Sequence, residues 1–112
     1  MDATYKLHAD LLKVMASATR LEILHLLGTG PRDIASLASG IATTEPNVSR
    51  DLTVLCAAGI VQGQLVGRSV RYALCDPEMK FACEMMRDLA RRRLERARVT
   101  RSSTATASSS TP

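Results

Sequence analysis

The middle of the sequence narrows the possible folds more than any other part, because two short helical segments are followed directly by two β-rich runs. Pro31 suits the first turn of the first of these two helices, and Gly40 ends that helix. Thr44 is a good N-cap for the second. The β-rich runs, residues 60–66 and 69–74, flank a Gly-containing turn and predict a β-hairpin. Two helices joined by a tight turn and followed by a hairpin are the layout of a winged helix-turn-helix.

Helical spacing of apolar residues predicts three more helices around this segment. Residues 3–15 form an amphipathic pattern. Ser17 suits the N-cap of a helix that is apolar almost all round and stops at Gly28, which predicts a buried central helix. Asp76 and Pro77 open a last helix of about twenty residues. The predicted fold is mainly α with a β-hairpin wing, in the order α-α-α-α-β-β-α.

Length and composition predict one domain that needs a partner. The chain has 112 residues, which allows a single domain, and only three aromatic residues to fill its core. A monomer of this size would be marginally stable, so we expect a homodimer. We expect the domain to span residues 1–98 and the Ser/Thr-rich residues 99–112 to be a disordered tail. No apolar run is long enough for a membrane span, and the N-terminus lacks the pattern of a secretory signal.

Positive charge is concentrated near the end of the chain. The formal net charge is +4, but residues 87–112 alone contain seven arginines against two acids and carry +5. A basic patch is the usual footprint of a nucleic-acid-binding protein. A solvated helix end has the same composition, so the patch alone leaves both interpretations open.

The sequence resembles the ArsR/SmtB family of small dimeric bacterial repressors, which sense metals, metalloids or thiol chemistry. The matching motifs occur in the family's order at residues 16–24, 46–55, 58–61 and 67–74, and the resemblance covers roughly residues 5–98. It implies that the first and last helices form the dimer interface. It also implies that the fourth helix lies in the major groove and the hairpin contacts the flanking backbone. A two-fold dimer would then bind a palindromic operator, with half-sites about one helical turn apart.

Polar residues off the apolar stripe of the fourth helix are the predicted DNA contacts. Asn pairs well with adenine and Arg with guanine, whereas Ser and Thr suit phosphates or either base. A helix N-terminus can hold a phosphate. On the fourth helix the candidates are Thr44, Glu45, Asn47, Ser49, Arg50 and Thr53. In the hairpin, Arg68 and Arg71 are the candidates for contacts with phosphates or the minor groove.

Acidic residues of the fourth helix count against tight binding. Asp51 stands where the family commonly has His, and Glu45 where it commonly has Gln. With Arg50, the helix carries a net charge of −1 from Thr44 to Ala58. Acids beside phosphates weaken binding, although they can accept a hydrogen bond from cytosine. We therefore expect weaker or more base-selective binding than is usual for the family.

The resemblance also suggests where an effector would bind. The family's arsenic-binding cysteine pair corresponds to Asp33 and Ala35, and the cysteine of persulfide sensors to His25, so neither site is present. The zinc-type site corresponds to two acids followed by Leu89 and Arg92, of which only the acids can bind a cation. A transition-metal or metalloid ion is an expected class of effector, and the weak ligand candidates are Asp76, Glu78, His8 and His25. Both histidines are lone residues on helices and are interpreted as structural, with nickel- or zinc-type ligation as the alternative.

Three cysteines are too few for a disulfide framework and predict a reduced, cytoplasmic protein. The zinc-type correspondence would place the dimer axis close to Cys83, where two thiols could form a disulfide or bind a soft ion. Cys83 and Cys75 are therefore the effector or redox candidates. Alternatively, Cys83 is a buried thiol on the apolar stripe of the last helix. Cys56 is expected to serve in packing.

The leading hypothesis is a dimeric repressor that a metal, metalloid or thiol-redox signal releases from double-stranded operator DNA. The alternative is a protein-interaction dimer that kept the fold and lost specific DNA binding. No nucleophile–base pair, phosphate-binding loop or metal motif is present, so we do not expect an enzyme.

Overall fold

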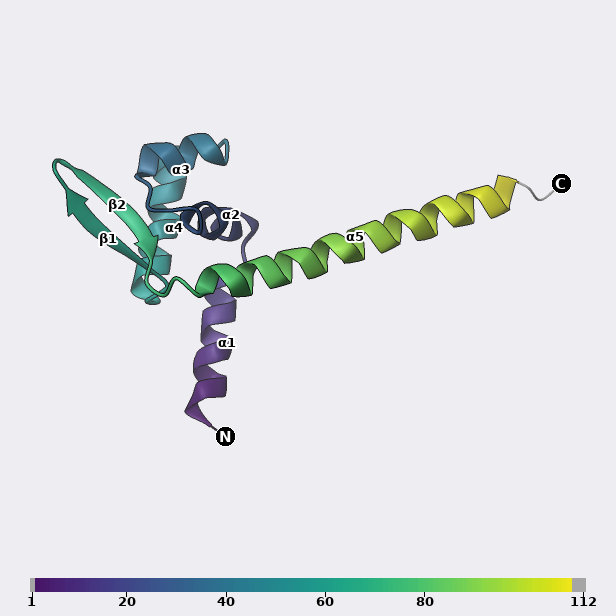
Figure 1. The fold of residues 1–112 in the computed structure, drawn as a ribbon, viewed down its shortest axis with the longest axis horizontal. Helices are drawn as coiled ribbons and strands as arrows, with labels where there is room; N and C mark the ends of the chain where they lie inside the picture. Colours follow the sequence, from purple (N-terminus) through teal and green to yellow (C-terminus); the bar gives the residue numbers. More distant parts are fainter. Residues whose placement is uncertain (1, 110–112) are drawn as a thin grey trace. The chain divides into compact units, whose positions relative to one another are not determined.

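The computed structural model describes the backbone of residues 2–109 and the side chains of residues 2–101. The order of elements is the predicted one (Figure 1). The elements are α1 (Ala3–Met15), α2 (Ala18–Leu27), α3 (Ile34–Gly40), α4 (Glu45–Ala57), β1 (Val61–Val66), β2 (Ser69–Leu74) and α5 (Met79–Ser109). None of the described helices is both long and apolar enough to cross a membrane.

Side-chain caps set where the first four helices begin. Asp2, Ser17 and Thr44 cap α1, α2 and α4, and each accepts a hydrogen bond from a backbone N–H of the first turn. The start of α3 differs from the prediction. Asp33 is its cap and accepts from Ser36 N at 2.8 Å, so Pro31 lies before the helix. The reason is that Arg32 exchanges two backbone hydrogen bonds with Tyr72 of β2, at 3.0 and 2.8 Å, which requires extended backbone.

The core of the first part of the chain is entirely aliphatic. Ten buried apolar residues come from α2, α3, α4 and the start of the hairpin: Ile23, Leu24, Leu27, Leu37, Ala38, Val48, Leu52, Leu55, Ile60 and Val61. The predicted stripe of α4 is fully confirmed. The helix α2 is less enclosed than predicted, since Leu21 is 45% exposed.

The end of α4 fixes the start of the hairpin. Gly59 has a φ of +74°, its N–H donates to Cys56 O at 3.0 Å, and Ile60 N donates to Leu55 O at 3.0 Å. These two bonds form a Schellman motif, which glycine favours because it has no Cβ. Ile60 and Leu55 are both buried. The chain therefore turns at Gly59 and enters β1 with its first side chain in the core.

The strands β1 and β2 form a two-stranded antiparallel hairpin, with Val61 opposite Leu74 and Val66 opposite Ser69. A two-residue turn, Gly67 and Arg68, joins them. Gly67 has a φ of +63°, as the first position of a type II′ turn requires. The pairing of Arg32 with Tyr72 anchors β2 to the segment between α2 and α3.

The chain divides into two compact units, the first ending at Lys80 and the second beginning at Phe81. The residues that we expected to form one domain, 1–98, therefore comprise the first unit and much of the second. The helix α5 has 31 residues and continues to Ser109, through most of the stretch that we expected to be disordered. Extending an existing helix requires no new nucleation, so residues with modest helix propensity can prolong it. Residues 110–112 lie outside the described part.

Candidate nucleic-acid interface

All eight residues predicted to contact DNA are exposed, six of them on or just before α4 and two in the hairpin. The opposite face of α4 is fixed, because Val48, Leu52 and Leu55 are buried in the core. With about 100° between successive residues, Arg50 and Thr53 lie near the middle of the outward face and Ser49 lies toward its edge. The structure thus presents one polar helix face on a rigid support.

The start of α4 uses part of its hydrogen-bonding capacity locally. The Thr44 hydroxyl oxygen accepts from Asn47 N at 3.3 Å, which satisfies one free N–H of the first turn. The Asn47 Nδ2 donates to Thr43 Oγ1 at 3.2 Å. This bond orients the amide and leaves its second N–H and its carbonyl oxygen available. Those two groups are what bidentate pairing with adenine requires.

Two residues near the middle of this face, Arg50 and Thr53, differ in whether their side chains are already hydrogen-bonded within the described residues. The Arg50 side chain has no hydrogen bond or ion pair within the described residues, and the same holds for Glu45. The Thr53 hydroxyl donates to Ser49 O at 2.9 Å. Thr53 can therefore act toward DNA only as an acceptor, whereas Arg50 keeps all its donors.

Asp51 is held inside the protein by Arg20. The Arg20 Nε donates to Asp51 Oδ1 at 3.1 Å, and its Nη1 donates to Val14 O at 2.9 Å. The two ion-paired side chains are only 25% and 16% exposed. Arg20 thereby connects the end of α1 and the start of α2 with the middle of α4. The net charge of −1 counted from the sequence overstates the acidity of the exposed face, whose charged residues are Glu45 and Arg50.

Sequence reasoning did not find this ion pair. Its partners lie 31 residues apart, so no helical spacing connects them. The available signal was the position of Asp51 beside the buried stripe of α4, where an unpaired carboxylate would be unfavourable.

The turn between α3 and α4 sets the direction in which α4 leaves α3. Thr43 N donates to Ala38 O at 3.0 Å, and Ala42 adopts a φ of +52°. Ala42 is the only non-glycine residue with positive φ in the described part of the chain. This conformation is unfavourable for a residue with a Cβ, so the surrounding structure must impose it.

The hairpin presents Arg68 at its tip and Arg71 as the third residue of β2. Neither side chain has a hydrogen bond or ion pair within the described residues. Close packing shapes the strands nearby, because a Cβ on Gly63 would lie 3.2 Å from both Val70 Cγ1 and Tyr72 Cε1. The hairpin can therefore offer two cations to a phosphate backbone beside the α4 face.

The thiols of Cys56 and Cys83 have raised pKa values. Burial raises the pKa of the Cys56 thiol, and the nearby Cys75 raises it further. In α5, burial and then Glu84 raise the pKa of Cys83. A raised pKa reduces the thiolate fraction near neutral pH and hence the reactivity. The sequence analysis did not predict that Cys75 lies near Cys56. The Cys75 backbone N–H donates to Ile60 O at 2.9 Å, and this bond holds the residue after β2 beside Ile60, shortly after the end of α4.

The metal candidates do not form a site within one chain. Among the residues that the structure describes, no three His, Cys, Asp or Glu side chains group where they could hold an ion. Asp76 Oδ1 accepts from Glu78 N at 2.9 Å, which stabilises the turn before α5. His8 and His25 are exposed on α1 and α2. The described residues therefore do not fit a resident metal in a single chain.

The helices α1 and α5 each expose large apolar side chains. No residue of α1 is buried, and its exposed set is Tyr5, Leu7 and Leu12. On α5 the exposed set includes Phe81, Met85, Met86 and Leu89. Exposed apolar residues in such numbers mark interaction surfaces.

Comparison with known proteins gives a consistent set of relatives. A model of the family described as "Bacterial regulatory protein, arsR family" matches residues 17–62, from the cap of α2 into β1. The HTH-type transcriptional regulator NmtR of Mycobacterium tuberculosis is 40% identical over 68 residues, which are 61% of this chain and 57% of NmtR. The match to the HTH-type transcriptional repressor SmtB of Mycobacterium tuberculosis covers 50% of SmtB. The chain therefore spans little more than half the length of these curated relatives.

Solved structures confirm the predicted fold. The homodimeric winged helix-turn-helix DNA-binding domain of Mb0332 from Mycobacterium bovis has a TM-score of 0.74 at 24% identity, covering 84% of this chain and 87% of that domain. The cadmium metal-sensor CmtR from Mycobacterium tuberculosis has a TM-score of 0.61 at 36% identity, covering 69% of this chain and 80% of CmtR.

Proposed function

Because the chain belongs to the ArsR family of bacterial regulatory proteins, we propose that it is a dimeric, sequence-specific DNA-binding transcriptional repressor. The family is one of transcriptional regulators and not of enzymes. The observation that carries the proposal is the outward face of α4. Its Arg50 side chain has no partner within the described residues, while three buried side chains and the Arg20–Asp51 ion pair fix the helix from behind.

In this proposal α4 enters the major groove. Arg50 donates to a guanine or a phosphate, and Asn47 pairs with an adenine through the amide groups that Thr43 leaves free. Thr44 and the N-terminus of α4 face a phosphate. Arg68 and Arg71 contact the backbone or the minor groove beside the half-site.

The protein acts as a two-fold dimer through α1 and α5. Both helices expose large apolar side chains that a second copy would cover. Two α4 helices related by a two-fold axis would bind a palindromic operator whose half-sites lie about one helical turn apart. The site of action is the cytoplasm, where the DNA lies and where thiols stay reduced.

Release from DNA follows a metal, metalloid or thiol-redox signal. The mycobacterial relative CmtR is a cadmium sensor, and this chain has three free cysteines that could bind a soft ion. Since the described residues of one chain offer no group of three ligands, an ion site in this proposal takes residues from both copies.

The test is a selection from a pool of randomised duplexes with the full-length protein, followed by titration of the enriched sequence. We expect an enriched inverted repeat that binds wild type tightly and R50A about 5- to 150-fold more weakly. The variant K6A removes one exposed cation from α1 and is the control. Cadmium, arsenite or peroxide is then added to the preformed complex, and one of them should release the DNA.

No enrichment of any sequence would contradict the proposal. With dimerisation intact, that result would favour the alternative function, a protein-interaction dimer that kept the fold and lost specific DNA binding. Equal affinity of R50A and wild type would remove Arg50 from the interface.

A further inference from the structure

The second half of α5 carries an unusual density of arginine. The arginine segment, defined as residues 87–101, contains Arg87, Arg91, Arg92, Arg93, Arg96, Arg98 and Arg101, no lysine and only two acids. All seven arginines are exposed. The segment lies outside residues 17–62, where the family model matches, and contains none of the predicted DNA contacts.

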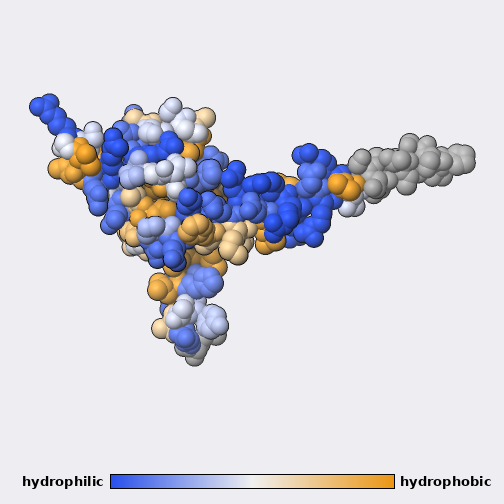
Figure 2. Space-filling model, viewed as in Figure 1, coloured by the Kyte–Doolittle hydropathy of each residue, from blue (hydrophilic) through white to orange (hydrophobic). Residues whose placement is uncertain are grey.

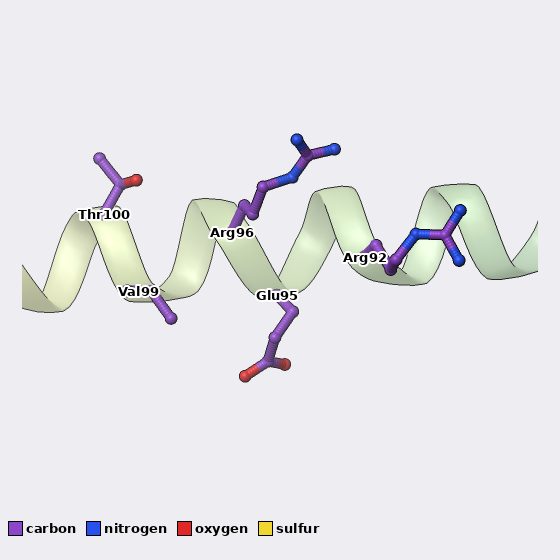
Figure 3. A pocket seen from close by; sticks show the side chains of 5 residues that line it. All are labelled: Arg92, Glu95, Arg96, Val99 and Thr100. Carbon is purple, nitrogen blue, oxygen red and sulfur yellow. The ribbon is translucent and has the colours of Figure 1, made fainter.

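Both acids of the segment are already paired with arginines. Asp88 pairs with Arg91 at 2.9 Å, and Glu95 with Arg98 at 3.8 Å. Arg92 and Arg96 have no ion pair within the described residues, and they lie about one helical turn apart. Together with Glu95 they are among the residues that line a pocket on this helix, and Figure 3 shows the Arg92 and Arg96 side chains extending in the same direction along the helix while Glu95 points to the other side.

The segment does not fit an apolar partner. Its large apolar residues are Leu89, Leu94 and Val99, and five residues of helix, or about 140° around the axis, separate each from the next. They form no common face, and Figure 2 shows this part of α5 as largely hydrophilic. A parallel pairing of two copies along the Arg92–Arg96 face would place arginine against arginine. The Arg92–Arg96 face is therefore disfavoured as a contact with a membrane surface or with the same face of a second copy.

We propose that the face of α5 formed by Arg92 and Arg96 binds DNA backbone phosphates, as a contact independent of sequence and additional to α4 and the hairpin. The proposal rests on the proposed function for the identity of the polyanion. The guanidinium group binds phosphate oxygens through two parallel hydrogen bonds, whereas an ammonium group acts as a point charge. A free pair of arginines one turn apart can thus hold phosphates without reading bases.

The test measures how DNA affinity depends on salt. The double variant R92Q/R96Q keeps residues of similar helix propensity, and circular dichroism checks that the helix is retained. Each phosphate contact contributes about 0.9 to the slope of log K against log salt concentration, so the slope should fall by about 1.8 for each bound protomer. Affinity should fall equally for operator and unrelated duplexes.

The matched control is R91Q/R98Q, which removes two positive charges from the same helix but takes them from existing ion pairs. We expect it to change the slope much less. An equal effect of both double variants would overturn the assignment of the contact to the Arg92–Arg96 face. An unchanged slope in R92Q/R96Q would also overturn it, and binding of the wild type alone to phosphatidylserine vesicles would then assign the face to a membrane.

The proposed function fails in a different way. If all duplexes bind alike and R92Q/R96Q lowers the slope, sequence-specific repression is wrong and the phosphate contact stands. If the operator is preferred and the slope is unchanged, repression stands and the phosphate contact is wrong. If no duplex binds, both are wrong.

Discussion

Arg50 and Asp51 are neighbours in the sequence but have opposite surroundings in the fold. Arg50 is exposed and has no partner within the described residues, while Asp51 is largely buried and paired with Arg20. The sequence predicted the exposed polar face of α4 correctly, because the spacing of Val48, Leu52 and Leu55 fixes which side is buried. It could not predict the role of Asp51, since that depends on a residue of another helix.

The substitution D51N tests whether Asp51 is structural. It removes the charge that Arg20 binds and leaves a poorly exposed guanidinium without its anion. We expect the free energy of unfolding to fall by about 1–2 kcal/mol, measured by urea denaturation. DNA affinity should not rise, although the protein gains positive charge. A clear increase in affinity with unchanged stability would show instead that Asp51 faces the DNA.

The thiols of Cys56 and Cys83 should react slowly. Their pKa values are raised, chiefly by burial, so at pH 7 to 8 less thiolate is present than for free cysteine. Alkylation by iodoacetamide, followed by peptide mass spectrometry, should be slower than for free cysteine and keep accelerating above the pH at which free cysteine levels off. Faster alkylation of Cys83 than of free cysteine at pH 7 would make it an activated sensor thiol.

At the scale of elements, local sequence signals located most boundaries. Ser17 and Thr44 cap the helices that they were expected to cap, and Gly67 provides the turn of the hairpin. The start of α3 was misplaced because Arg32 pairs with Tyr72, about forty residues away in the chain, and no local rule includes such a bridge. The turn between α3 and α4 contains Ala42 in a left-handed conformation, which the sequence does not predict because alanine rarely adopts it.

The turn between α3 and α4 should become more stable in A42G. The left-handed conformation costs a residue with a Cβ about 1–2 kcal/mol, whereas the added flexibility of glycine in the unfolded chain costs about 0.5–1 kcal/mol. Urea denaturation should therefore show a net gain of about 0.5–1 kcal/mol. The matched control is A58G, where the backbone is right-handed and the same change should destabilise. A loss of stability in A42G similar to that in A58G would contradict this account.

At the scale of the whole molecule, one chain leaves large apolar side chains of α1 and α5 exposed, which a second copy would cover in the proposed dimer. The sequence predicts a dimer from its shortage of aromatic residues, and α1 has no buried residue of its own. The length of α5 was underestimated, because composition alone does not show that a Ser/Thr/Ala-rich stretch can continue a helix. The candidate effector site was predictable only as a set of cysteines and weak ligand candidates, because the described residues of one chain bring no three such side chains together.

Dimerisation should depend on the exposed apolar side of α1. Leu12 is 51% exposed, so L12E places a charge on the surface without entering the core of the chain. We expect sedimentation velocity to show a dimer for wild type and a predominantly monomeric species for L12E. The variant K13E introduces the same side chain at the next position, which is polar in the native chain, and should remain dimeric. A stable dimer of L12E would exclude this side of α1 from the interface.

The central claim is that the α4 face recognises a DNA sequence. The most direct test titrates the reduced, full-length protein against a duplex from just upstream of its own gene and against a scrambled duplex of equal length and composition, at several salt concentrations. We expect the upstream duplex to bind at least about a thousandfold more tightly than the scrambled one. Both affinities should fall steeply as salt rises. Equal binding of the two duplexes, or no binding of either, would contradict it.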